Sequence, residues 1–195
     1  IVAIACTFIQ IVVGCAYGGI MAYFGGWLDE VMMRIVEILT SIPSLLLTLL
    51  IMMVLGQNMG ALLVAMCLTS WCGTARQMRG MIRESEYVMA AETLGANPSW
   101  IIRKHLIPNT LSILILNVAT SIPSYIFTEA SLSFLGMGLK EPVISLGVLI
   151  SNGQSVLDLY PYQIFYPALV LCIIVLAFNL LGDGLRDALD PRLRQ

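Results

Sequence analysis

Long stretches without a single charged side chain constrain this sequence more than any other feature. No Asp, Glu, Lys or Arg occurs in residues 1–28, 38–75, 106–128 or 159–182. A helix that crosses a bilayer needs about 20 predominantly apolar residues, and each of these runs is long enough. Charged residues make up only 11% of the chain, against about a quarter in soluble domains. The sequence therefore predicts an all-α, polytopic membrane protein.

The longest run, residues 38–75, exceeds one span and breaks naturally at Gly56–Gly60, where two glycines and two amides favour a turn. A shorter apolar piece, Val143–Leu157, is typical of an interfacial or re-entrant segment. Because the chain begins inside an apolar run, we expect at least one further N-terminal helix, with residues 1–195 forming a single transmembrane domain. The five predicted spans cover roughly residues 1–24, 36–55, 60–80, 109–132 and 165–184.

The distribution of basic residues predicts the orientation of the chain. Lys and Arg mark the cytoplasmic ends of short loops, and with five spans every basic residue except Lys140 falls on one side. We therefore expect residues 84–108 and the tail 185–195 to be cytoplasmic, and residues 136–164 to be extracytoplasmic. The basic residues on the predicted cytoplasmic side are Arg34, Arg76, Arg79, Arg83, Arg103, Lys104, Arg186, Arg192 and Arg194.

The predicted cytoplasmic segment 84–108 has the pattern of two short helices around a corner. Glu86–Leu94 is helix-prone, with acidic residues near its start, and Gly95 fits its C-terminal stop. Asn97-Pro98 fits the cap and first turn of a second helix, and Pro108 marks the beginning of the next span. On this pattern alone, the segment is either a docking element or an amphipathic loop that rests on the lipid headgroups.

Ala90-Ala91, then Gly95, then Pro108 thirteen residues later form a spacing that resembles the EAA loop of bacterial ABC importer permeases. Further sequence motifs narrow the resemblance to the second permease subunit of the dipeptide, oligopeptide and nickel subfamily. The resemblance extends in order over nearly all 195 residues. These motifs are AYFGGWLDEVMMRIVEILTSIPSLLL, EYVMAAETLGA, HLIPN, EASLSFLGMGL and LGDGLRDALDPRLR.

The chain departs from the family pattern at two positions. Met89 stands immediately before the two alanines, where the family has the Glu that names the motif, and acidic residues flank it at Glu86 and Glu92. The acidic contact to an ATPase therefore falls to Glu86 or is absent. Ile107 replaces the usual Leu before the proline, which is a mild change.

The resemblance implies a type I ABC importer transmembrane fold with separate partners. These are a homologous second permease subunit, two ATP-binding ATPase subunits, an extracytoplasmic substrate-binding protein and the lipid of the bacterial inner membrane. ATP and Mg would bind to the ATPases, so we expect no cofactor on this chain. The coupling loop that docks on an ATPase would include Glu86, Ala90, Ala91, Glu92, Gly95 and Pro108.

Three residues inside predicted spans are candidates for the translocation path. Pro43 and Pro123 each lie in a SIPS sequence, and a proline kinks a helix or frees carbonyl groups that need a partner or a wet cavity. Glu129 is an intramembrane acid near the outer end of its span, where it could attract the amino terminus of a peptide. The alternatives are a simple packing kink for the prolines and a structural hydrogen bond for Glu129.

Several functions are disfavoured by what the sequence lacks. It contains no GxxxxGK[ST] motif, only one histidine (His105) and no Ser/His/Asp set, so we expect neither catalytic residues nor a metal site. The net charge of −2 does not favour nucleic acid. We predict a permease for dipeptides or oligopeptides. The alternatives are import of nickel or another small solute, an ion-coupled secondary transporter or channel with Glu129 as its titratable group, and a membrane enzyme.

Overall fold

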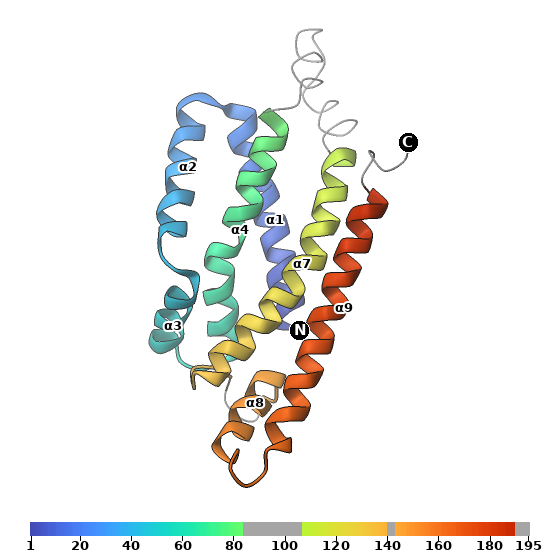
Figure 1. The fold of residues 1–195 in the computed structure, drawn as a ribbon. Coiled ribbons are helices and arrows are strands. Elements are labelled where there is room, and N and C mark those ends of the chain that lie inside the picture. The colour runs from blue at the N-terminus through green and yellow to red at the C-terminus, as the bar shows by residue number, and fades with distance from the viewer. Residues whose placement is uncertain (84–106, 140–142, 190–195) are drawn as a thin grey trace.

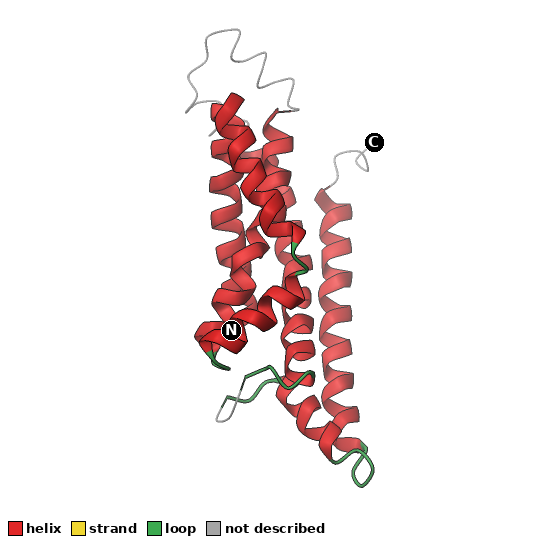
Figure 2. Cartoon of the chain, turned by 90° about the vertical axis from the view of Figure 1, so that its left-hand side faces the viewer, coloured by secondary structure: helices red, strands yellow, loops and turns green. Residues whose placement is uncertain are grey.

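The computed structural model describes residues 1–83, 107–139 and 143–189, and the regular structure in these residues is helical. The chain forms an elongated bundle in which long helices run alternately up and down (Figure 1). The cartoon in Figure 2 shows the same helices from a second direction. The helices are α1 (Val2–Phe24), α2 (Gly26–Ser41), α3 (Ser44–Leu55), α4 (Met59–Arg83), α7 (Ile107–Phe134), α8 (Leu146–Ser155) and α9 (Tyr162–Leu189).

Hydropathy and length qualify α1 and residues 162–185 of α9 as membrane spans, in agreement with the predicted spans 1–24 and 165–184. Helices α4 and α7 coincide with the predicted spans 60–80 and 109–132 and run alongside α1 and α9 (Figure 1). The apolar segment Val143–Leu157 contains the short helix α8, which lies at one end of the bundle between α7 and α9 (Figure 1). The last helix continues to Leu189, so the predicted tail begins as part of α9.

The structure differs from the predicted span over residues 36–55. Two helices, α2 and α3, cover this region and meet at an angle of 80°, so the region is not one straight helix. The break lies at Ile42, which has an extended backbone (φ −89°, ψ 129°), immediately before Pro43. A proline disfavours the α conformation of the residue before it, which explains the position of the break. By contrast, Pro123 lies inside the continuous helix α7.

The most extensive helix contact joins α1 to α4, and two glycines of α1 make it possible. A Cβ on Gly14 would lie 2.6 Å from Cβ of Thr74, and one on Gly18 would lie 2.3 Å from the carbonyl oxygen of Ala75. The backbones therefore approach as closely as the small side chain of glycine allows, as is common between membrane helices. A Cβ on Gly19, one residue further along, would have no neighbour within 4 Å.

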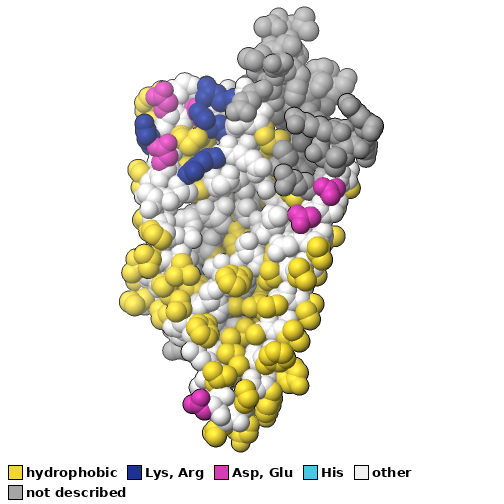
Figure 3. All heavy atoms as spheres, viewed as in Figure 1, with side chains coloured by type: hydrophobic (Ala, Val, Ile, Leu, Met, Phe, Trp, Pro, Cys, Tyr) yellow, Lys and Arg dark blue, Asp and Glu magenta, His cyan; other side chains and the backbone are white. Residues whose placement is uncertain are grey.

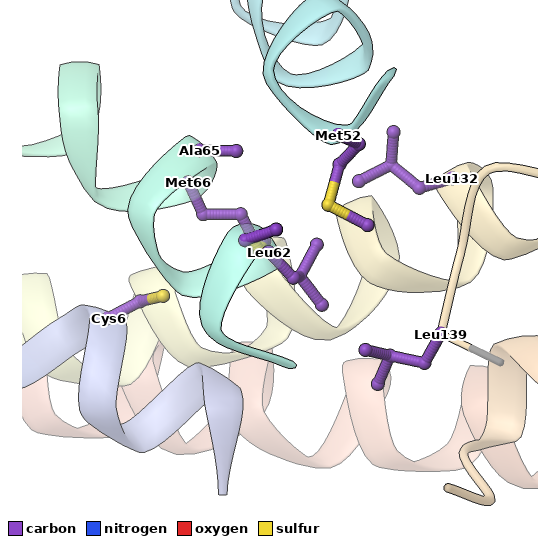
Figure 4. Close-up of a cluster of buried hydrophobic side chains, with 8 residues drawn as sticks. Cys6, Met52, Leu62, Ala65, Met66, Leu132 and Leu139 are labelled. Carbon is purple, nitrogen blue, oxygen red and sulfur yellow. The ribbon is translucent and has the colours of Figure 1, made fainter. Parts of the chain in front are cut away.

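A cluster of buried apolar side chains holds the lower half of the bundle together (Figure 4). It joins α1, α3, α4 and α7 with the segment that follows α7. The side chains of Met52, Leu62 and Leu132 are fully buried and form its centre. The other members are Cys6, Ala61, Ala65, Met66 and Leu139.

The surface is divided along the length of the bundle (Figure 3). Apolar side chains cover its middle and lower parts, whereas Arg side chains gather at the upper end over α2 and α4. Most of α9 is exposed: in its most apolar stretch of 18 residues, only 6% is buried. Lipid or another protein must cover such a face in a membrane. The four arginines at this end are Arg34, Arg76, Arg79 and Arg83.

Candidate functional site

Most of the predicted coupling residues lie outside the described part of the chain. These are Glu86, Ala90, Ala91, Glu92 and Gly95. The structure does describe the helices that lead into and out of this segment, since α4 ends at Arg83 and α7 begins at Ile107. Pro108 occupies the first turn of α7, a position that accepts proline because the first amides of a helix have no intrahelical partner.

A buried ion cluster fixes the end of α4 next to this segment. The carboxylate of Asp29, in the first turn of α2, is 2% exposed. It accepts two hydrogen bonds from Arg79, at 2.5 Å from Nε and 2.6 Å from Nη2, and a third from Arg83 at 2.5 Å. The two bonds from Arg79 use the planar fork of its guanidinium group, which matches both carboxylate oxygens. The start of α2 is therefore tied to the last two turns of α4.

A glycine turn brings Asp29 to this position. Gly25 has φ 60° and ψ −159°, and Gly26 has φ 51°, so both adopt backbone conformations that other residues rarely tolerate. The turn reverses the chain between α1 and α2, and the carbonyl of Gly25 then accepts a hydrogen bond from the Asp29 amide. The FGGWLDE sequence thus directs an acidic side chain inward at the end of the bundle.

An open cavity of about 380 Å³ lies between α1, α3, α4 and α7. Its lining is polar but uncharged: among the described residues that form it, none is acidic or basic, and nine carry a hydroxyl group. The remaining two lining residues are Gln10 and Met66. The hydroxyl-bearing residues are Ser44, Thr48, Thr69, Ser70, Thr120, Ser121, Ser124, Tyr125 and Thr128.

Gln10 joins three helices at the side of this cavity. Its amide nitrogen donates a hydrogen bond to Oγ1 of Thr74 in α4 at 3.0 Å, and its oxygen accepts one from the hydroxyl of Tyr125 in α7 at 2.6 Å. Both ends of the amide are thus satisfied within the bundle. This bridge fixes α1, α4 and α7 relative to one another where the polar surface is formed.

The two predicted prolines lie next to this cavity in the sequence. Pro43 directly precedes the lining residue Ser44, and Pro123 lies between Ser121 and Ser124. The structure therefore brings the neighbours of both prolines together on one polar surface. It does not bring Glu129 to the same surface.

Glu129 instead lies in a second, mostly apolar cavity of about 410 Å³. Its side chain is buried, and Oε1 accepts hydrogen bonds from the hydroxyls of Ser133 at 2.9 Å and Ser145 at 2.7 Å. Ser145 in turn caps α8, because its Oγ accepts a hydrogen bond from the amide of Val148 at 3.1 Å. The described contacts of Glu129 therefore match the structural alternative: it connects α7 to the cap of α8.

The sequence analysis missed two features of the site. The first is the row of hydroxyl groups on α7: Thr120, Ser124 and Thr128 are four residues apart, a spacing that places them on one helix face and that the sequence alone could have indicated. The pairing of Asp29 with Arg79 and Arg83 joins residues about 50 positions apart, so no local pattern reveals it.

The bundle and its polar cavity define a helical membrane protein with an uncharged hydrophilic surface among its spans. The model of the binding-protein-dependent transport system inner membrane component family matches residues 12–195. The chain belongs to this family and is an inner-membrane protein, as the sequence predicted.

Relatives of known name share about two fifths of its residues. The chain is 41% identical over 197 residues to the oligopeptide transport system permease protein OppC of Bacillus subtilis. It is 42% identical over 198 residues to the dipeptide transport system permease protein DppC of the same organism. Both alignments use the whole chain, which spans 65% and 62% of these relatives.

Solved structures confirm the predicted ABC transporter fold. Structures of the MetNI methionine ABC transporter in inward-facing conformations match with a TM-score of 0.74 and 20% identity, over 97% of this chain and 91% of theirs. An amino acid ABC transporter solved with histidines matches with a TM-score of 0.67 and 20% identity, over 96% of this chain and 90% of that one.

Proposed function

We propose that this chain is a transmembrane permease subunit of an ATP-driven importer of dipeptides or oligopeptides. The observation that carries the proposal is the likeness, over the whole chain, to permease proteins named for oligopeptide and dipeptide transport. The chain contributes half of a translocation path, and a homologous second permease contributes the other half. ATP hydrolysis takes place on two separate ATPase subunits, and an extracytoplasmic binding protein delivers the substrate.

The polar cavity is the candidate surface for that path. Its volume of about 380 Å³ falls within the range of small-molecule sites, and its hydroxyl groups offer hydrogen bonds without a fixed charge. An uncharged surface suits a carrier of peptides, whose side chains differ in charge while their backbones do not. Pro43 lies at the start of α3 and Pro123 lies inside α7, which are two of the four helices that border this surface.

The coupling segment 84–108 transmits the motion of the ATPases. It connects α4 to α7, and both helices contribute to the cavity lining. Glu86, Ala90, Ala91, Glu92, Gly95 and Pro108 belong to this segment. We assign the segment and the C-terminal tail to the cytoplasm, because basic residues gather at the end of the bundle where α4 ends.

The experiment that tests the proposal is uptake by a reconstituted complex. Proteoliposomes would contain the full-length chain, its partner permease and the ATPases, with the binding protein added outside. Labelled dipeptide, pentapeptide and nickel are offered in parallel, with and without ATP. We expect ATP-dependent uptake of one peptide class. We also expect its loss in Gly95→Trp, with insertion into the membrane unchanged.

Each other outcome overturns a defined part of the proposal. Uptake of nickel alone keeps the importer but rejects peptides as the substrate. Normal uptake by Gly95→Trp rejects the assignment of the coupling loop. Uptake that persists without ATP and collapses with an ionophore indicates an ion-coupled secondary transporter.

A further inference from the structure

The hydroxyl groups of the polar cavity are not equivalent donors and acceptors. Thr48 in α3 donates a hydrogen bond to the carbonyl of Ser44 at 2.8 Å. In α7, Thr120 donates to the carbonyl of Leu116 at 3.1 Å and Ser124 to that of Thr120 at 3.0 Å. Thr128 follows the same rule and donates to the carbonyl of Ser124 at 2.8 Å.

The direction of these bonds is fixed, because a carbonyl oxygen can only accept. A hydroxyl group has one proton and two lone pairs. Once its proton is directed at the preceding turn of its own helix, only lone pairs remain for the cavity. At these four positions the lining therefore presents hydrogen-bond acceptors, although a hydroxyl group could also donate.

Three of these acceptors form a ladder along α7. Thr120 and Ser124 are exposed and Thr128 is half-buried; all three line the cavity and lie four residues apart. With a rise of about 1.5 Å per residue, successive hydroxyls are about 6 Å apart along the helix. In an extended peptide, N–H groups on one side recur at every second residue, at about 6.8 Å. The two spacings are close enough for a short peptide to place successive N–H groups along the ladder.

We infer that Thr120, Ser124 and Thr128 form a substrate-binding ladder of acceptors that selects solutes by their backbone N–H and ammonium donors. The inference rests on the proposed function, of which it names the recognition chemistry. Peptides of any side-chain sequence share these donors, so the ladder is blind to sequence. A solute without N–H or O–H donors gains nothing from it.

The test uses the reconstituted complex with the full-length chain, its partner permease, the ATPases and the binding protein. The variant T120V/S124A/T128V removes the three acceptors and nearly preserves side-chain volume. The substrates are a tripeptide and the same tripeptide methylated on both amide nitrogens, which lacks two donors. Both are supplied at concentrations that saturate the binding protein, so that differences arise in the permease.

We expect the triple variant to take up the unmethylated tripeptide about tenfold more slowly than the wild type, which corresponds to one or two neutral hydrogen bonds. Methylation should slow the wild type by a similar factor and should slow the triple variant no further, because the lost donors and lost acceptors belong to the same bonds. The double variant Thr120→Ser/Thr128→Ser retains all three acceptors and should take up the tripeptide at the wild-type rate.

Thr7→Val is the matched control. Thr7 of α1 donates the same kind of hydrogen bond, to the carbonyl of Ala3 at 2.8 Å, but it is buried and does not line the cavity. Its substitution should leave uptake unchanged. Equal uptake by the triple variant and the wild type, or losses from methylation and substitution that multiply, would overturn the ladder. Absence of ATP-dependent peptide uptake by the wild type would overturn the proposed function itself.

Discussion

The guanidinium group of Arg79 donates two hydrogen bonds to the buried carboxylate of Asp29, from Nε to Oδ1 at 2.5 Å and from Nη2 to Oδ2 at 2.6 Å. Arg83 adds a third charge-assisted bond, and it is the last residue of α4 before the proposed coupling segment. The cluster thus fastens α2 to α4 at the end of the bundle where force from an ATPase would enter. The contribution of this cluster to the stability of the protein can be tested independently of transport.

Asp29→Asn should destabilise the protein, because a neutral amide cannot balance two guanidinium groups. Breaking a fully buried ion pair costs about 3–5 kcal/mol. Arg79 and Arg83 retain 27% and 45% exposure, so water compensates them in part, and we expect a loss of about 1–3 kcal/mol. Thermal unfolding of the full-length protein in detergent, followed by tryptophan fluorescence, measures the difference.

Glu37→Gln is the control for this change. Glu37 pairs with Arg34 at 2.7 Å on the surface of α2, where the two side chains are 47% and 78% exposed. Exposed pairs of this kind contribute about 0.5 kcal/mol or less. If both variants unfold at the wild-type temperature, the Asp29 cluster does not contribute to stability.

The contact between α1 and α4 should reject any side chain at Gly18. In Gly18→Ala the new Cβ would lie 2.3 Å from the carbonyl oxygen of Ala75, so one helix must move. We expect a loss of about 1–3 kcal/mol, as for other overpacked interiors. Gly19→Ala has open space around the added Cβ and should unfold at or slightly above the wild-type temperature, because alanine favours a helix more than glycine does. Equal melting temperatures for the two variants would contradict this close packing.

The sequence predicted the helical class, the positions of most long helices and the family, because these depend on hydropathy and on local sequence motifs. It allowed for a kink at Pro43 but did not predict a break of 80° that divides the predicted span into α2 and α3. A charge-free run shows that a segment is apolar, but it does not show where the helix changes direction. The same SIPS sequence bends the chain at Pro43 and leaves α7 continuous at Pro123. The outcome depends on neighbouring helices, which hydropathy does not describe.

The site was predicted less completely than the fold. Glu129 was recognised as an unusual intramembrane acid, but its partner Ser145 lies beyond the end of α7, and only the folded chain brings them together. The polar cavity collects residues from four helices, so no single stretch of sequence reveals it. Local patterns therefore identify unusual residues, whereas their partners follow from packing.

Glu129 should control how firmly α8 is held against α7. Glu129→Ala removes the acceptor of both Ser133 and Ser145, so the cap of α8 loses its support. We expect faster hydrogen–deuterium exchange at the amides of Val148 and Leu149, which bond to Ser145. Glu129→Gln keeps one acceptor oxygen and should exchange more slowly than Glu129→Ala. Exchange unchanged in both variants would show that α8 is held by packing alone.

Pro43 should maintain the break between α2 and α3. In Pro43→Ala the restriction on Ile42 is lifted, and residues 26–55 can form a straighter helix. Spin labels carried by noncanonical amino acids at Ile38 and Val54, which are 65% and 82% exposed, would report the change. In a straight helix these positions lie about 24 Å apart along the axis, and we expect the measured distance to lengthen towards that value. Pro123→Ala, in α7, should leave it unchanged. An unaltered distance in Pro43→Ala would instead assign the bend to the packing of α3 on α4, with proline only marking its position.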